Sequence, residues 1–305
     1  MSWNPHHLPD LHGRTYAITG STAGIGYFAS EQLAAAGADV ILAGRSPEKL
    51  ARASAAIRTH VHDASVGTVE LDLASLSSVS SAADALSDRG RLDGLFLNGG
   101  SMGTNTSTLT ADGLPIMLGT HVVAGFALAT RLLPVLDGRI VHASSGFVRR
   151  LRMEVDDVRA PQRGFFRTYT QAKTVTELFA YELERRLRQD GHPAASLVAH
   201  PGVGVDARTP ARKGVYDPRT QRRRNPFSPW AQGKDAAAWS AVRALTDPGA
   251  SGGEYYGPEN GRRGLPVRLE PLAHTASADR DRVTRVWQQL ERLAAPVLAG
   301  GRGGM

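Results

Sequence analysis

The chain contains no cysteine, which removes several kinds of chemistry at once. Disulfide bonds, thiol nucleophiles and cysteine-ligated metal centres are excluded. A chain without cysteine suits a reducing compartment, and the polar residues 1–10 do not have the apolar core of a signal peptide. We therefore expect a cytoplasmic protein.

Signals of other protein classes are also absent or weak. No internal repeat of about 20–50 residues occurs. The longest mostly apolar stretch, residues 114–136, is interrupted by two glycines, a histidine and an arginine, which predicts a buried helix and no membrane span. The net charge of +7 has no nucleic-acid recognition motif beside it. Residues 60–63 (His-Val-His-Asp) lie in a polar connection, so we predict no metal site.

Short runs of β-forming residues alternate along the chain with helical patterns. The runs are residues 15–19, 39–43, 68–71, 94–97, 139–143, 195–199 and 254–256. Repeated β-α units with short connections predict an α/β fold, a parallel sheet covered by helices on both faces. With 305 residues, 41% of them hydrophobic, and no long linker, we expect a single domain over residues 1–305.

Three glycines follow the first predicted strand and lead into a helical pattern. Gly20, Gly24 and Gly26 do not have the spacing of the G-x-G-x-x-G dinucleotide fingerprint. Such a turn still places backbone N–H groups and the positive end of the helix dipole together, which suits a pyrophosphate. We predict a cofactor-phosphate site here; the alternative is that the glycines serve only a tight turn.

A serine, a tyrosine and a lysine follow in an order that indicates acid–base chemistry. Tyr169 and Lys173 are four residues apart and therefore share one face of a predicted helix, and Ser145 precedes them. Reduction of a ketone puts charge on an oxygen, which must be stabilised and protonated. A phenol with an ordinary pKa near 10 is a poor acid–base catalyst at pH 7. A nearby cation favours its ionised form and so lowers this pKa. We expect Lys173 to lower the pKa of Tyr169; a surface Tyr/Lys pair with a loop serine is the alternative.

Together these motifs resemble the short-chain dehydrogenase/reductase superfamily, and most of all its retinol-dehydrogenase-like branch, over essentially the whole chain. The matching pieces are residues 19–26, Asp72-Leu73, Asn98-Gly99-Gly100, Ser145, Tyr169 with Lys173, His200-Pro201-Gly202, and a block over residues 253–287. The resemblance implies a doubly wound Rossmann sheet of seven parallel strands in a homo-oligomer, a dimer or tetramer. It also implies hydride transfer between a nicotinamide cofactor and a carbonyl or alcohol, with Ser145 donating a hydrogen bond to the substrate oxygen.

The resemblance further assigns residues to the cofactor. They are Gly20, Ser21, Thr22, Gly24, Ile25, Gly26, Arg45, Asp72, Leu73, Asn98, Gly99, Gly100, Tyr169, Lys173, Pro201, Gly202 and Val203. Lys173 would hold the nicotinamide ribose and Asp72 the adenine edge. The second strand ends in Gly44-Arg45 without an acid, and a guanidinium there can bind a 2′-phosphate, so we expect NADP(H) in preference to NAD(H). A surface arginine without a ligand is the alternative.

Three positions depart from the family pattern. His121 stands where the fourth catalytic residue, an asparagine on a proton path to the lysine, is expected. A histidine there could relay protons or only fill a helix kink. Gly99 replaces an alanine, a mild change. Asp206 replaces a threonine that usually contacts the cofactor, and because its charge would repel phosphates, we expect this loop to run differently.

Basic residues are concentrated in two segments that we expect to flank the cleft mouth. A segment over about 206–230, predicted to close over the substrate, carries Arg208, Arg212, Lys213, Arg219, Arg222, Arg223 and Arg224 against Asp217. The loop before Tyr169 carries Arg149, Arg150, Arg152, Arg159, Arg163 and Arg167, partly offset by Glu154, Asp156 and Asp157. Positive potential can steer an anion, so we expect a substrate or carrier with a carboxylate or phosphate. Ordinary solvated charge, or the charge of NADPH itself, is the alternative.

The sequence thus predicts an NADP(H)-dependent ketone reductase or alcohol dehydrogenase acting on a small organic molecule, with a C-terminal extension over about 253–305. Its Arg- and Ala-rich composition indicates a GC-rich genome and, loosely, secondary metabolism. Two alternatives stay open. One is an enzyme of this fold with a non-redox or redox-neutral step, such as cyclisation or epimerisation. The other is a catalytically silent cofactor-binding protein. The presence of all three residues Ser145, Tyr169 and Lys173 argues against this second alternative.

Overall fold

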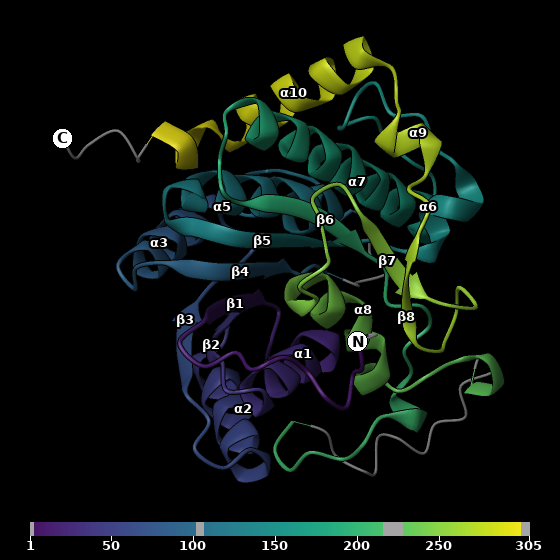
Figure 1. Cartoon of the computed structure of the whole chain (residues 1–305). Coiled ribbons are helices and arrows are strands. Elements are labelled where there is room, and N and C mark those ends of the chain that lie inside the picture. Colours follow the sequence, from purple (N-terminus) through teal and green to yellow (C-terminus); the bar gives the residue numbers. More distant parts are fainter. Residues whose placement is uncertain (1–2, 102–106, 216–227, 300–305) are drawn as a thin grey trace.

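The computed structural model describes residues 3–101, 107–215 and 228–299, and a single sheet of eight strands runs through its centre (Figure 1). The strands are β1 (Thr15–Thr19), β2 (Asp39–Gly44), β3 (Val66–Glu70), β4 (Leu92–Leu97), β5 (Leu136–Ala143), β6 (Ala195–Ala199), β7 (Tyr255–Pro258) and β8 (Pro266–Leu269). Their order across the sheet is β3-β2-β1-β4-β5-β6-β7-β8. The order reverses between β1 and β4, and ligands of such sheets bind beyond the carboxyl ends of the strands at that point.

Strands β1 to β7 pair in parallel and confirm the predicted doubly wound sheet, but the prediction of seven strands missed β8. This last strand runs antiparallel to β7, with Tyr255 opposite Leu269 and Pro258 opposite Pro266. It is only four residues long and begins with proline. Proline is tolerated at the first residue of an edge strand, and so short a run does not show the alternation by which strands are found.

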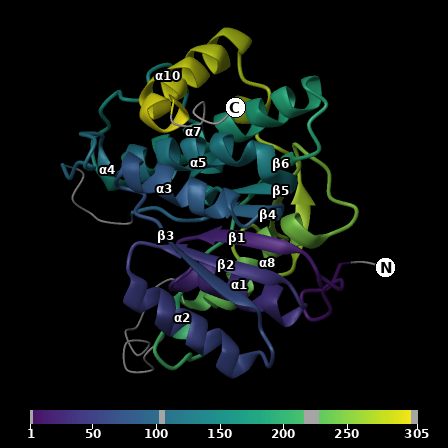
Figure 2. The same cartoon turned by 90° about the vertical axis from the view of Figure 1, so that its left-hand side faces the viewer.

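Helices cover both faces of the sheet (Figures 1 and 2). One face carries α1 (Gly24–Ala35), α2 (Pro47–His60) and α8 (Lys234–Thr246), and the other α3 (Leu76–Ser87), α5 (Ala124–Leu132) and α7 (Phe165–Gln189). The short helices α4 (Ile116–Leu118), α6 (Gly146–Leu151) and α9 (Ala273–Ala276) lie in connections, and α10 (Arg280–Ala299) packs outside α5 and α7. The two faces enclose separate apolar cores.

The predicted buried helix is confirmed as a nearly continuous helical run. It passes from α4 through a π-helical turn (Gly119–Val123) into α5 and ends in a 3-10 turn (Leu133–Val135). The run Ile116–Val135 is long and apolar enough to cross a membrane by length and composition, yet 72% of its most apolar window is buried inside this fold. Packing against α3, α7 and α10 accounts for its apolar composition.

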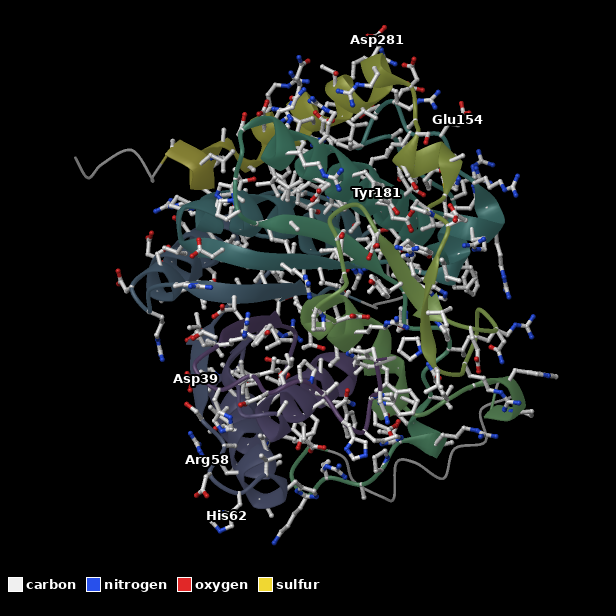
Figure 3. The ribbon with its side chains drawn as sticks, viewed as in Figure 1. Asp39, Arg58, His62, Glu154, Tyr181 and Asp281 are labelled. Atoms are coloured by element: carbon white, nitrogen blue, oxygen red, sulfur yellow. The ribbon has the colours of Figure 1, made fainter. Side chains whose placement is uncertain are left out.

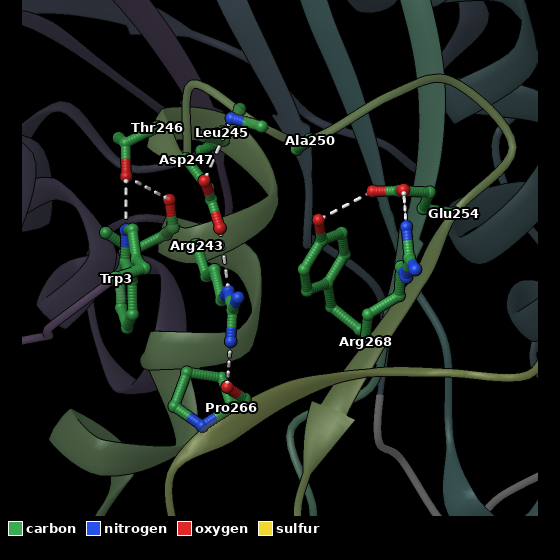
Figure 4. A network of polar contacts seen from close by, with 12 residues as sticks. Trp3, Arg243, Leu245, Thr246, Asp247, Ala250, Glu254, Pro266 and Arg268 are labelled. Atoms are coloured by element: carbon green, nitrogen blue, oxygen red, sulfur yellow. Dashed lines mark hydrogen bonds and ion pairs between the residues drawn. The ribbon is translucent and has the colours of Figure 1, made fainter. Parts of the chain in front are cut away.

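The C-terminal hairpin β7–β8 is held to the rest of the fold by a polar network around α8 (Figure 4). Arg243 of α8 pairs with Asp247 at 2.9 Å and donates to the carbonyl oxygen of Pro266 at 2.6 Å. Within the hairpin, Arg268 pairs with Glu254 at 2.8 Å. The contact with Pro266 holds the start of β8, next to the turn that borders the candidate site, and the Arg268 pair joins the two strands at the other end of the hairpin.

Candidate active site

The glycine turn brings the carboxyl ends of β1 and β4 into backbone contact. Gly20 and Gly24 have φ angles of +65° and +64°, which glycine adopts without strain. A Cβ on Gly26 would lie 2.6 Å from the Gly20 carbonyl oxygen, and one on Gly20 would lie 2.7 Å from the Gly99 Cα. The helix α1 that follows has no side-chain cap at Ala23. Its first N–H groups are therefore available to an anion, and the residues present fit a cofactor pyrophosphate.

A cavity of about 500 Å³ extends from this turn along the carboxyl ends of β2 and β3. It is lined by Gly20, Thr22, Gly44, Arg45, Leu71, Asp72, Leu73, Ala74, Gly99, Gly100, Ser101, Ile116 and Thr120. Seven of the predicted cofactor residues are among them. Arg45 is exposed at the end of β2 and makes no hydrogen bond or ion pair with any other residue that the structure describes. Asp72 is partly buried, and its Oδ1 accepts a hydrogen bond from Ala74 N at 2.9 Å.

The other predicted cofactor residues do not line this cavity. Ser21 is fully buried, and its hydroxyl donates to the Ala43 carbonyl at 3.3 Å. Its side chain therefore serves the fold, and only its backbone can serve a ligand. Ile25, Asn98 and Pro201 line a narrow gap of about 10 Å³ beside the turn.

A second cavity, of about 430 Å³, opens on the same edge of the sheet. Its lining comes from α6, the loop after β6 and the β7–β8 turn: Ser145, Gly146, Phe147, Arg149, Arg150, His200, Gly202, Val203, Glu259, Asn260, Gly261, Arg262 and Leu269. Ser145 is the N-cap of α6 and accepts a hydrogen bond from Phe147 N at 3.3 Å. Of the predicted site residues, Ser145, Gly202 and Val203 thus border this second cavity.

The structure brings Ser145, Tyr169 and Lys173 together. Tyr169 and Lys173 lie one turn apart on α7, and the Ser145 side chain lies close enough to the Tyr169 hydroxyl to act on its pKa. Lys173 is buried, with its Nζ donating to the Ala143 carbonyl at 2.7 Å and lying 5.9 Å from the centre of the Tyr169 ring. The three side chains therefore form one polar cluster at the ends of β5 and β6.

The electrostatics of the cluster differ from the expectation that Lys173 lowers the pKa of Tyr169. Burial raises the pKa of Tyr169, and the Ser145 side chain opposes this. The ammonium group of Lys173 is directed at the Ala143 carbonyl, and burial lowers its own pKa to about 8, with Glu177 acting in the opposite direction. At neutral pH the site therefore holds a protonated phenol above a charged lysine.

His121 lies inside the site, on the π-helical turn, a feature that often marks functional positions. Its Nε2 is 2.9 Å from the Ser101 carbonyl, and its ring meets Tyr169 edge-on with centroids 5.4 Å apart. Nε2 must donate to that carbonyl, so Nδ1 is the acceptor nitrogen; it is buried and has no partner among the described residues. A Cβ on Gly100 would come within 2.0 Å of the ring, so this glycine makes room for the histidine.

Asp206 begins a 3-10 turn, and Lys234 of α8 pairs with it at 2.6 Å. This pairing compensates the charge that would repel cofactor phosphates. The expected position of Arg212 at the cleft mouth is wrong, because its guanidinium binds both oxygens of Glu31 on α1 at 2.7 Å. Asp217, Arg219, Arg222, Arg223 and Arg224 of the predicted closing segment lie outside the described residues.

The basic loop before Tyr169 places Arg149 and Arg150 on the second cavity. Two of the acids expected to offset them pair with a different arginine. Arg282 of α10 pairs with Glu154 at 2.9 Å and with Asp156 at 3.2 Å. Figure 3 shows Glu154 near α9 and α10, away from the strands. The charged residues that line this cavity are Arg149, Arg150 and Arg262 with one acid, Glu259, so their net charge is positive.

Several residues of the site were not predicted. They are Phe147 of α6, the β7–β8 turn with Glu259, Asn260 and Arg262, and Glu177 on α7. The glycine-rich turn after the last predicted strand could have indicated the first set. Glu177 follows Lys173 by one helical turn, a spacing that could have drawn attention to it.

Three histidines near the site are held neutral, and this should make stability depend on pH. Burial lowers the pKa of His121 and His142 to about 3 and that of His200 to about 4, from an ordinary value of 6.5. In the unfolded chain each would protonate near pH 6.5, so the stability that each contributes is complete above that pH and is lost as the pH falls.

We expect each of these histidines to lower the free energy of unfolding, measured with denaturant, between pH 6.5 and pH 5, with a slope that approaches about 1.4 kcal/mol per pH unit. Replacing His142 with Gln should reduce the dependence of the unfolding free energy on pH by the contribution of one histidine. His62, whose side chain is 96% exposed, provides the control: His62→Gln should leave the slope as it is. Because the raised pKa of Glu177 acts with the opposite sign in this pH range, the decisive outcome is the variant: a slope that is the same in His142→Gln would contradict the assignment of a neutral His142.

Comparison with known proteins agrees with this geometry. Residues 14–154 match the family model for short chain dehydrogenases. The chain is 30% identical to the polyprenol dehydrogenase of Mus musculus, over 98% of this chain and 88% of that protein. It is 31% identical, over 91% of each chain, to DnrU of Streptomyces sp. (strain C5), by its name a candidate daunorubicin C-13 ketoreductase. Other relatives are matched over only about half to two thirds of their own length.

Solved structures share the fold. A crystal structure of an uncharacterized protein from Mycobacterium paratuberculosis superposes with a TM-score of 0.76 at 28% identity, covering 97% of this chain and 98% of that one. A short-chain dehydrogenase from Burkholderia cenocepacia, crystallised in complex with NADP, gives a TM-score of 0.60 at 22% identity, covering 78% of this chain and 92% of that one. From its fold, its site and these relatives, the chain belongs to the short-chain dehydrogenase/reductase family.

Proposed function

We propose that this protein transfers a hydride between NADP(H) and a ketone or secondary alcohol of a small organic molecule. The observation that carries the proposal is the meeting of Ser145, Tyr169 and Lys173 at the carboxyl edge of the sheet. One cavity on that edge contains the glycine turn and Arg45, and the other contains Ser145. A dinucleotide and a carbonyl substrate can thus meet at the Tyr169 hydroxyl.

Each residue has a distinct task in this reaction. The bound nicotinamide supplies or accepts the hydride. Ser145 donates a hydrogen bond to the substrate oxygen, and Tyr169, which lies beside Ser145, delivers the proton in the reductive direction. Lys173 stabilises the phenolate that remains. Because burial keeps Tyr169 protonated at neutral pH, this arrangement favours reduction of a ketone.

The choice of NADP(H) rests on the end of β2. Gly44 and Arg45 line the first cavity, and no carboxylate follows β2 where an NAD enzyme binds the ribose hydroxyl. The guanidinium of Arg45 makes no ion pair within the described ranges, so its planar donors are available to a 2′-phosphate. The Burkholderia cenocepacia protein of the same fold was crystallised with NADP, which agrees with this choice.

The second cavity favours a substrate with an apolar, aromatic body and an anionic group. Phe147 packs against Phe166 and Tyr169, with ring centroids 5.4 and 6.4 Å apart, and forms an aromatic wall. Arg149 lines the same cavity and hydrogen-bonds to no other residue in the described part of the chain. The name of DnrU, a candidate daunorubicin C-13 ketoreductase, supports a secondary metabolite as the class of substrate.

The alternatives receive less support. A silent cofactor-binding protein would not need Ser145 beside Tyr169 or a buried Lys173. A redox-neutral step would use the same residues, so only the fate of the hydride separates it from a reductase. A cytoplasmic location and a homo-oligomer stay predictions.

The cofactor proposal predicts that NADPH binds more tightly than NADH. Replacing Arg45 with Ala removes a charge-assisted pair with the 2′-phosphate, so the Kd for NADPH should rise by roughly ten- to a hundredfold. The Kd for NADH should change little. Isothermal titration of both cofactors measures this; equal affinities in the unaltered protein would refute the preference.

The catalytic proposal predicts that Tyr169→Phe abolishes turnover while NADPH still binds. The ring and its stacking on Phe165, 5.9 Å between centroids, are preserved, and only the proton donor is lost. Lys173→Ala should impair both turnover and binding. Steady-state rates and NADPH fluorescence titrations give the two readouts. Full activity of the Tyr169→Phe variant would exclude the phenol as acid.

The substrate proposal predicts that Arg149→Gln raises KM selectively for anionic ketones. Matched pairs of aromatic keto acids and their methyl esters provide the probes. The KM of the acids should rise by about tenfold and lose its dependence on salt, and that of the esters should stay constant. Arg285→Gln, an exposed arginine of α10 paired with Asp156, is the control. An unchanged KM for the acids would leave Arg149 as solvated charge.

A further inference from the structure

Glu177 is a fully buried carboxyl group behind the active site to which the proposed reaction assigns no task. Its Oε1 accepts a hydrogen bond from the Ser144 hydroxyl, and its Oε2 accepts one from the Thr275 hydroxyl at 2.8 Å. These two neutral hydroxyls are its hydrogen-bond partners in the part of the chain that the structure describes. Removing a carboxylate from water is costly, so its presence here calls for a compensating interaction.

The two hydroxyl donors come from distant parts of the chain. Ser144 directly follows β5 and precedes Ser145, and its N donates to the Ala199 carbonyl of β6 at 2.8 Å. Thr275 belongs to α9 in the C-terminal region. Glu177 therefore joins the catalytic turn, helix α7 and the C-terminal region in one buried cluster.

The ionisable groups around Glu177 come from three elements. Lys173 on α7 and Arg149 on α6 act on it as cations. Tyr181 on α7 and Tyr255 on β7 are buried phenols whose pKa values are raised by burial and by Glu177. Arg149 is exposed to water, whereas Lys173 is buried. Lys173 is thus the cation that most needs a counter-charge within the protein.

We propose that Glu177 is a positioning residue that keeps Lys173 protonated, and that Ser144 and Thr275 hold the Glu177 carboxyl group in its ionised form. Lys173 and Glu177 are spaced as i and i+4 on one helix face, the spacing of helical ion pairs. The link to catalysis rests on the proposed function, in which Lys173 stabilises the Tyr169 phenolate. The electrostatic interaction between the two side chains does not depend on that function.

The pKa directions agree with this pairing. Burial raises the pKa of Glu177 to about 7, and the Ser144 and Thr275 hydroxyls lower it. Burial lowers the pKa of Lys173 to about 8, and Glu177 raises it. Both groups are charged mainly between these two values. Loss of the Glu177 charge should let Lys173 release its proton at a lower pH.

The direct test is an NMR titration of Lys173 in the full chain without cofactor or substrate. The chain has four lysines, Lys49, Lys173, Lys213 and Lys234, so ¹³Cε-labelled lysine gives few signals, and Lys173→Arg assigns the one of interest. We expect Glu177→Gln to move the Lys173 titration midpoint down by about one pH unit. Thr275→Val should move it less in the same direction, and Thr275→Ser, which keeps the hydroxyl, should leave it in place.

Glu182→Gln is the matched control. Glu182 is an equally buried acid on α7, but it pairs with Arg185, Arg186 and Arg280. Its replacement should lower stability without moving the Lys173 midpoint. An equal shift in this variant would overturn the proposal, because the effect would then come from loosening of α7.

An unchanged midpoint in folded Glu177→Gln would also overturn the proposal. If that variant does not fold, the Thr275 pair decides: a shift in Thr275→Val but not in Thr275→Ser supports the proposal, and no shift in either refutes it. With an active substrate, the alkaline limb of the pH–rate profile should move with the Lys173 midpoint. A moved midpoint without any reductase activity would refute the proposed function and leave the pairing intact.

Discussion

The close approach of two backbone segments at the ends of β1 and β4 is the constraint on which the rest of the site depends. Thr19 Oγ1 accepts hydrogen bonds from the N–H groups of Asn98 and Gly99, at 3.0 and 2.9 Å. Asn98 Nδ2 in turn donates to the Thr19 carbonyl at 3.1 Å. This contact needs glycine at residues 20, 26 and 99, because side chains there would meet backbone or neighbouring atoms. It sets where α1 begins, and therefore where a cofactor phosphate can bind.

Burial is the second determinant of the site's chemistry. Lys173, Glu177 and His121 are all withdrawn from water, and each consequently shifts towards its neutral form. The phenol of Tyr169 follows the same rule and stays protonated. A protonated acid beside a lysine that still carries its charge is the arrangement that ketone reduction requires. Burial keeps His121 neutral, so it does not relay protons as an imidazolium ion. Its Nδ1, which has no partner among the described residues, can accept a hydrogen bond.

Periodicity and motif order predicted most of the fold and the membership of the site. Each predicted strand overlaps an observed one, and Ser145, Tyr169 and Lys173 meet as expected. These features depend on local patterns, which a single sequence displays. The placement in the retinol-dehydrogenase-like branch and the cofactor contacts stay predictions.

What the sequence could not provide depends on contacts between distant residues. Arg212 pairs with Glu31, 181 positions away, so the local composition led to a wrong prediction of where its charge lies. Glu154 likewise pairs with a distant residue, Arg282 of α10. The Lys173 ammonium turned out to be held by the Ala143 carbonyl, a contact that depends on how deeply α7 packs against β5. Burial and long-range pairing have no local sequence pattern, and they set the electrostatics of this site.

The most direct measurement for the central claim follows the hydride itself. NADPH carrying deuterium at C4 of the nicotinamide, prepared separately in its two stereoisomers, is incubated with the protein and an aromatic ketone that it converts. Mass spectrometry of the product should show deuterium on the carbinol carbon from one stereoisomer and none from the other. A product that forms without deuterium from either stereoisomer would contradict hydride transfer and point to a redox-neutral reaction.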